Sequence, residues 1–363
     1  MNYGLQFLKL LGRGVLLLAS VAACSAQNSP LPTRVWSVGP LSKSAPVMGG
    51  VIVGSGTVLT GLRADGQTGS IFAATRRVVF ARDRIVIASI ADATEKQVWQ
   101  LFSLDVKTGE IKNSREFVGF GVRAIFATDD GHIVVSGSSV LRLTPDLTDD
   151  GSFDYHATGH RFGRVQNISP DGSTLGNATS PGFELIDVHT LKATTLTESP
   201  LVDTSVSSKA VVSDSPRWFK DYPKAKSFAT LTDQQGQHLI FHGDCGGRPQ
   251  FLRDDRVLTA SCKIARILDT QGNILKTITL HDFLSFAGVS QNGKRFALQV
   301  ATFSGMHEVK HESFVIYSVD TGEPVAEVAP DVAALEQSWS ALSPDGSMIV
   351  VGSPAKLTLY RLP

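Results

Sequence analysis

The sequence predicts an all-β fold built from repeated hairpins, and three observations support this class. Gly and Pro are frequent, at 33 and 16 of 363 residues, and they occur with Asp or Asn in short polar turns. No long stretch has the apolar spacing of an amphipathic helix. A phrase made of a polar turn and a following apolar strand recurs along most of the chain.

The turn phrase is clearest near the C-terminus, where Ser343-Pro344-Asp345-Gly346 precedes the apolar stretch 347–352. Pro presets φ at the first turn position, Asp accepts a backbone N–H, and Gly supplies a positive φ. The phrase therefore marks a chain reversal between two strands. Copies begin at Arg82, Asp129, Ser169, Gln234, Asp254 and Gln291. They lie roughly 20 to 65 residues apart, most near 40 to 50.

A second phrase lies between many of these turns. Segments 102–110 and 316–323 each contain a strand, an Asp-initiated turn, a Gly and a return strand, and 184–191 and 267–272 are looser copies. Two hairpins per unit make a four-stranded antiparallel sheet, which is one blade of a β-propeller. Several strands are apolar at consecutive positions, as expected when both faces of each blade are covered.

The length after the leader suits a single β-propeller of about seven blades, with six or eight as alternatives. The last turn phrase lies too close to the C-terminus to open a complete blade. We therefore expect 348–351 and 356–362 to be completed by N-terminal strands near 35–38 and 51–53. Closing the ring in this way removes unpaired strand edges.

These repeats resemble the superfamily of YVTN, WD-repeat and quinoprotein-like β-propellers over nearly all of the mature chain. The resemblance concerns the fold. Trp36, Trp99, Trp218 and Trp339 are never followed by Asp, so the WD signature itself is absent. The stretch 103–109 is similar to the quinoprotein dehydrogenase repeat, although Asn113 stands where that repeat has Trp.

The N-terminal residues 1–24 read as a signal peptide of the lipoprotein type. Lys9 and Arg13 precede an apolar stretch too short to span a bilayer. Val21-Ala22-Ala23-Cys24 resembles a lipobox, which predicts lipidation of Cys24 in a bacterial envelope, whether periplasm or outer surface. Cleavage after Ala26 is the alternative. Residues 25–32 then form a linker and 33–363 the propeller domain.

Two cysteines remain in the mature chain if Cys24 carries lipid. Cys245 and Cys262 are an even pair that an oxidising compartment can join as a disulfide. Two buried free thiols are the alternative.

The charge balance limits the kinds of partner. The chain has 34 Lys+Arg and 34 Asp+Glu, a formal net charge of zero, so its overall field attracts neither nucleic acid nor an anionic membrane. We expect membrane contact only through the lipid anchor, and any site for a charged ligand must be local.

One short motif has the letters of a zinc site. His307-Glu308-Val309-Lys310-His311 matches H-E-x-x-H, but that chemistry needs a helix to bring both imidazoles to one metal. The strand pattern of 313–317 predicts an exposed hairpin loop instead. His307 and His311 stay weak metal candidates that would need an outside ligand.

Basic residues recur where each blade is expected to begin. Counting back about eight residues from the turn phrases leads to the entry of each first strand, which lines the central channel. The residues found there are Arg76 or Arg77, Arg123, Arg164 and Arg248, with Lys226 two residues off register. His281, Asp282 and Glu336 complete this set on the other blades. It predicts a basic channel mouth for an anionic ligand or acidic partner, while ion pairs between blades are the alternative.

The sequence thus favours a monomeric binding module that contacts an unidentified protein or small anionic ligand, with no cofactor required. The alternative is a propeller enzyme, a lactonase-like hydrolase or a quinoprotein-like dehydrogenase, because the fold alone decides neither. No catalytic residues can be named from the pattern.

Overall fold

The computed structural model describes part of the chain. The described residues are 31–38, 58–62, 68–72, 78–92, 98–153, 163–179, 182–199, 201–214, 227–243, 249–261, 263–280, 285–303, 309–330, 339–352 and 356–363. The chain separates into a unit Met1–Pro30 and a unit Leu31–Pro363. All that follows concerns the second unit.

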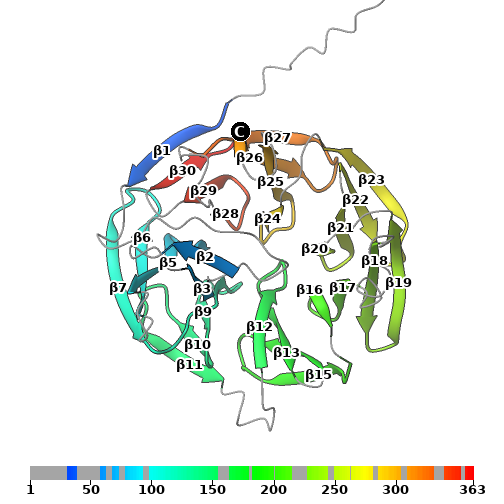
Figure 1. The fold of residues 1–363 in the computed structure, drawn as a ribbon, viewed down its shortest axis with the longest axis horizontal. Coiled ribbons are helices and arrows are strands. Elements are labelled where there is room, and N and C mark those ends of the chain that lie inside the picture. The colour runs from blue at the N-terminus through cyan, green and yellow to red at the C-terminus, as the bar shows by residue number, and fades with distance from the viewer. Residues whose placement is uncertain are drawn as a thin grey trace, which may run out of the picture. The chain divides into compact units, whose positions relative to one another are not determined.

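Seven four-stranded antiparallel sheets form the blades of a ring, which confirms the predicted all-β propeller of seven blades (Figure 1). The first three in chain order are β4(Val78–Ala81)–β5(Arg84–Asp92)–β6(Val98–Asp105)–β7(Ile111–Val118), β8(Ala124–Ala127)–β9(Ile133–Ser136)–β10(Val140–Leu143)–β11(Asp149–Phe153), and β12(Gly163–Ile168)–β13(Thr174–Thr179)–β14(Phe183–Asp187)–β15(Ala193–Thr197). The next three are β16(Val202–Val206)–β17(Val211–Asp214)–β18(Ser227–Asp233)–β19(Gly236–Gly243), β20(Gln250–Arg253)–β21(Arg256–Ser261)–β22(Ile264–Asp269)–β23(Ile274–Thr279), and β24(Ser285–Val289)–β25(Arg295–Phe303)–β26(Val309–Ser318)–β27(Pro324–Val328). The first strands of successive blades lie next to one another around the centre, and the fourth strands form the rim (Figure 1).

The seventh blade closes the ring with strands from both ends of the domain. Its order is β28(Trp339–Leu342)–β29(Met348–Gly352)–β30(Leu357–Arg361)–β1(Thr33–Val38), so β1 is the rim strand. One N-terminal strand completes this sheet rather than the two that we expected, because 339–342 supplies the inner strand. The other expected strand, 51–53, lies outside the described residues.

The turns between first and second strands use one repeated device. Ser343 Oγ donates to Asp345 Oδ1 at 2.6 Å, Met348 N donates to Ser343 Oγ at 2.9 Å, and Gly346 has a φ of 74°. In the turns at Thr128, Ser169 and Ser290, the hydroxyl likewise donates to the Asp or Asn two residues further on. A backbone N–H donates to the hydroxyl of Ser169 and of Ser290 as well. The recurring phrase is thus a hydrogen-bonded cap that fixes the turn.

Apolar side chains on both faces of the inner sheets form the core between blades. All four residues of β4 and of β9 are buried, which explains their continuous apolar runs. Between the blades of β4 and β8, the cluster includes Trp99, Leu101 and Ile133, none more than 2% exposed.

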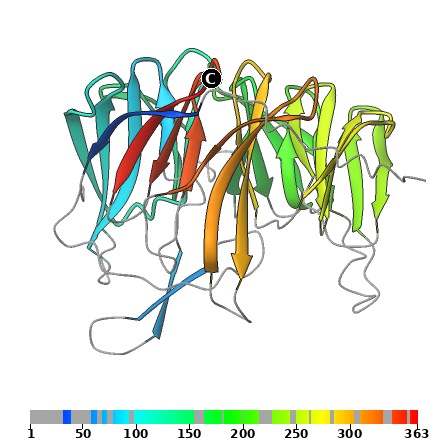
Figure 2. The same ribbon diagram turned by 90° about the horizontal axis from the view of Figure 1, so that it is seen from above.

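Two strands belong to no blade. β2(Val58–Leu62) and β3(Thr68–Phe72) pair as an antiparallel hairpin, which Figure 2 shows on the face of the ring opposite the C-terminus. Nowhere in the described ranges does a helix have the length and hydropathy needed to cross a membrane.

Candidate functional site

One mouth of the central channel is crossed by the side chain of Gln291. Gln291 lies in the turn between β24 and β25, and its Nε2 donates to the carbonyl oxygen of Thr128 at 3.1 Å. Thr128 follows β8, whose blade is not next to that of β24 in the ring. A Cβ on Gly172, in a third blade, would lie 3.0 Å from the same nitrogen. This amide therefore joins two blades by hydrogen bonding and lies close to a third at this end of the channel.

Neighbouring turns are also joined at this mouth. Asn292 N donates to Pro344 O at 3.0 Å, and Asn292 Nδ2 donates to Asp345 O at 2.8 Å. Asp129 N donates to Gly172 O at 3.2 Å. We call this side the turn face, because the turns between first and second strands form it. Its hydrogen bonds narrow the turn-face mouth. The opposite side is the strand-entry mouth, where the inner strands begin.

A cavity lies inside the channel, behind Gln291. Its volume is about 80 Å³. Its wall comes from β4, β24 and β28 and from the turn ends of β8 and β12, and includes Phe80, Ile168, Val289, Ser340 and Leu342. Among the described residues that line it, none has a charged side chain.

Only two residues of the predicted basic mouth fall within the described residues. Arg123 is exposed and directly precedes β8, with its N–H donating to Ser136 O at 2.7 Å. Arg164 is the second residue of β12. Both thus stand where an inner strand begins.

The other members of that set lie outside the described residues: Arg77, Lys226, Arg248, His281, Asp282 and Glu336. The strands after Arg77, Arg248, Asp282 and Glu336 are β4, β20, β24 and β28, each the first strand of its blade. Lys226 precedes β18, which is the third strand of its blade. The turn at Gln234 joins β18 to β19, so counting back from it leads to the third strand.

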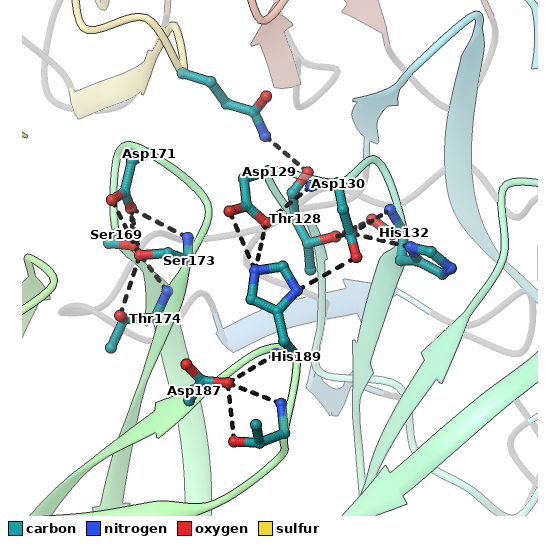
Figure 3. A network of polar contacts seen from close by, with 12 residues as sticks. Thr128, Asp129, Asp130, His132, Ser169, Asp171, Ser173, Thr174, Asp187 and His189 are labelled. Atoms are coloured by element: carbon teal, nitrogen blue, oxygen red, sulfur yellow. Dashed lines mark hydrogen bonds and ion pairs between the residues drawn. The ribbon is translucent and has the colours of Figure 1, made fainter.

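A polar network joins two blades on the turn face (Figure 3). His189, in the turn after β14, places Nε2 3.1 Å from Asp129 Oδ1 and Nδ1 3.4 Å from Asp130 Oδ2. Both carboxylates belong to the turn between β8 and β9. Arg142 donates from Nη2 to Asp130 Oδ2 at 2.6 Å and from Nη1 to His189 O at 3.1 Å. The contacts tie the turn of one blade to the next blade.

Asp130 is the centre of this network. Burial alone would raise the pKa of its carboxyl group, but hydrogen bonds from Thr128 and His132 and the charge of Arg142 outweigh burial. Together they hold the pKa of Asp130 well below its ordinary value. The carboxylate is therefore ionised whenever the protein is folded near neutral pH.

The network contains side chains that can bind a metal, but their contacts are with one another and with Arg142. Asp129, Asp130 and His189 each offer a ligand atom within 4.8 Å of the others. However, the two carboxylates face different nitrogens of the imidazole, whereas a metal would bind through one nitrogen. The carboxylate of Asp130 is also paired with the guanidinium group of Arg142. The arrangement is suited to holding two blades together.

The zinc-like motif is interrupted by a strand. Val309, Lys310 and His311 are part of β26, and His311 is exposed, with Nε2 3.9 Å from Glu327 Oε1. The last three residues of the motif, which were predicted to lie in a hairpin loop, are therefore in the strand. His307 and the cysteines Cys24, Cys245 and Cys262 lie outside the described residues.

Comparison with known proteins supports the fold and leaves the function open. No family model matches the chain, and no curated protein matches it. A chain in the crystal structure of a mitotic checkpoint complex superposes with a TM-score of 0.54 at 13% identity, over 99% of each chain. The fold is that of a WD-repeat-like β-propeller. Since 808 chains of solved structures match, this likeness by itself selects no activity.

Proposed function

We propose that the protein is an exported, lipid-anchored β-propeller that binds an anionic ligand or an acidic protein partner at its strand-entry mouth. The observation that most supports this proposal is that hydrogen bonds of Gln291 and the adjoining turns bridge the turn-face mouth. In this proposal the ligand binds at the beginnings of the inner strands, on the side that these bonds do not bridge.

Local charge at those positions supports the anionic class of ligand. Arg123 is exposed and begins an inner strand, and Arg164 takes the equivalent place in the next blade. Guanidinium groups bind carboxylates and phosphates through paired hydrogen bonds. Because the whole chain has no net charge, attraction of an anion depends on such a local group.

A fluorescent peptide of ten glutamates is a suitable probe of this mouth. We expect the double variant Arg123→Glu/Arg164→Glu to weaken its binding at least about tenfold, as expected for reversing charges at a contact. Added salt should weaken binding to the wild type. Unchanged binding by a folded double variant would contradict the proposal.

The matched control has the same change of net charge away from the strand entries. Lys107→Glu/Lys276→Glu alters an exposed residue after β6 and an exposed residue of rim strand β23. This control should bind the probe like the wild type. A loss equal to that of the arginine variant would show that net charge, and not the mouth, determines binding.

Export and anchoring are tested separately on the mature protein. Mass spectrometry should find an N-terminal diacylglyceryl-modified Cys24, while a mature chain that begins at Gln27 would refute the anchor. Differential alkylation should find Cys245 and Cys262 joined, and two free thiols would refute the disulfide.

A further inference from the structure

The cavity behind Gln291 has the features of a binding site for an uncharged molecule. It lies at the turn end of the channel. Three of its lining residues, Ala127, Ile168 and Leu342, are each the last residue of an inner strand. Gln291 bridges the channel at this end. A molecule there would be surrounded by several inner strands.

One buried polar atom in the wall lacks a partner. Among the described residues, no group forms a hydrogen bond with Ser340 Oγ, although this atom is buried. Ser340 belongs to β28 and lines the cavity. A buried hydroxyl without a partner is unfavourable, and a hydroxyl can both donate and accept. A ligand atom next to it would complete the missing bond.

The rest of the wall defines the chemistry of the occupant. Val78, Phe80, Ile168, Val289 and Leu342 provide apolar contacts. Because no described lining residue has a charged side chain, a charged ligand in contact with them would lose hydration without gaining an opposite charge. These residues therefore disfavour ions of either sign.

We infer that this cavity binds a compact, uncharged molecule that has an apolar body and one hydroxyl or carbonyl group bonded to Ser340. The site is separate from the basic strand entries of the proposed function, and its ligand class is different. Either proposal can fail while the other holds.

Cyclohexanol is the probe, with cyclohexanecarboxylate and cyclohexylammonium as charged molecules of similar size. In ligand-observed NMR titrations of the full mature chain, we expect saturable binding of cyclohexanol and at least about tenfold weaker binding of both ions. Equal binding of all three, or no saturable binding of cyclohexanol, would overturn the inference.

Variants locate the binding. Ser340→Ala should weaken cyclohexanol binding about two- to tenfold, the range for one neutral hydrogen bond, and Ser340→Leu should abolish it by filling the cavity. If Ser340→Leu does not fold, Ser340→Val adds less volume and replaces it. Ser152→Ala, at an exposed serine of rim strand β11, is the control and should bind normally.

The charge-reversal variant separates the two proposals. Arg123→Glu/Arg164→Glu should bind cyclohexanol like the wild type, and Ser340→Ala should bind the glutamate peptide like the wild type. Cyclohexanol binding that survives in folded Ser340→Leu and Ser340→Val would place the ligand elsewhere and refute the site.

Discussion

Replacing Trp36 tests how β1 holds the ring closed. Trp36 is partly buried on β1, and its Nε1 donates to Val106 O, in the next blade, at 2.7 Å. Its ring also covers Gly109, where a Cβ would lie 2.9 Å from the indole. Trp36 therefore connects the last blade to the first, and Trp36→Ala removes that connection.

The expected loss follows from these contacts. A fully covered tryptophan buries about 150–250 Å². Because Trp36 is only partly buried, we take half of that area, which at about 25 cal/mol/Å² contributes about 2–3 kcal/mol to the free energy of unfolding. The hydrogen bond adds about 1 kcal/mol. At an unfolding entropy of about 0.7 kcal/mol/K for a unit of this length, Trp36→Ala should lower Tm by about 4–6 °C.

Differential scanning calorimetry measures this change directly. Trp36→Phe keeps an aromatic ring but loses the N–H and part of the apolar area, so its Tm should fall less than that of Trp36→Ala, by about 2–3 °C. Val35→Ala is the control on the same strand, because Val35 is 39% exposed, and it should melt within about 1 °C of the wild type. A wild-type Tm for Trp36→Ala would refute the role given to β1.

Three further predictions concern the turns. Gly109→Ala should lower the free energy of unfolding by about 1–3 kcal/mol in urea titration, because φ is 73° and the new Cβ meets Trp36; no loss would contradict this geometry. Gln291→Ala should speed hydrogen exchange of the turn-face amides about fivefold, as expected for one lost hydrogen bond, and an unchanged rate would show that Gln291 does not hold the turns. The pKa of Asp130 is lowered from 3.8 on folding, so its contribution is present above about pH 4 and is lost as the pH falls further. The difference in urea midpoint between wild type and Asp130→Asn should therefore be smaller at pH 3 than at pH 7, and an equal difference would disprove the ionised role.

The blade architecture could be predicted because it depends on local turn chemistry. In the turns at Ser343 and Ser169, the Asp carboxylate accepts a backbone N–H, as the residue types suggested. The blade of β16 to β19 shows the limit of this approach. Its first turn, 207–210, contains no Gly, Pro or Asp, so the turn phrase does not mark it. The turn at Gln234, which joins the third and fourth strands, has the phrase instead.

Ring closure was predicted only in part, for a similar reason. The strand 339–342 has few strong strand formers, and the segment before it has no turn phrase. The sequence pattern therefore did not predict a strand there. Pairing with β29, from Trp339↔Gly352 to Leu342↔Ile349, establishes it as a strand. Tertiary pairing decides such segments, and local propensity does not.

The polar contacts between blades could not be predicted from one sequence. His189 and Asp129 are 60 positions apart, and Gln291 and Thr128 are 163 apart, so only the closed ring brings them together. Asp149 and Asp150 begin β11 and form ion pairs with Arg115 and Arg142. Asp254 is bonded to Ser208 of the neighbouring blade. Residue type suggested a role in each case, while the partner came from the fold.

Both proposed sites depend on a ring in which β1 pairs with β30, and a disulfide tests that pairing most directly. Ser37 faces Thr358 in the register, with their hydroxyl oxygens 2.9 Å apart. In the double variant Ser37→Cys/Thr358→Cys, oxidation and peptide mapping should find a bond between positions 37 and 358 in nearly all molecules. The pair Ser37→Cys/Ser152→Cys should not form one. Failure of 37 and 358 to cross-link in the folded protein would contradict the closed seven-bladed ring.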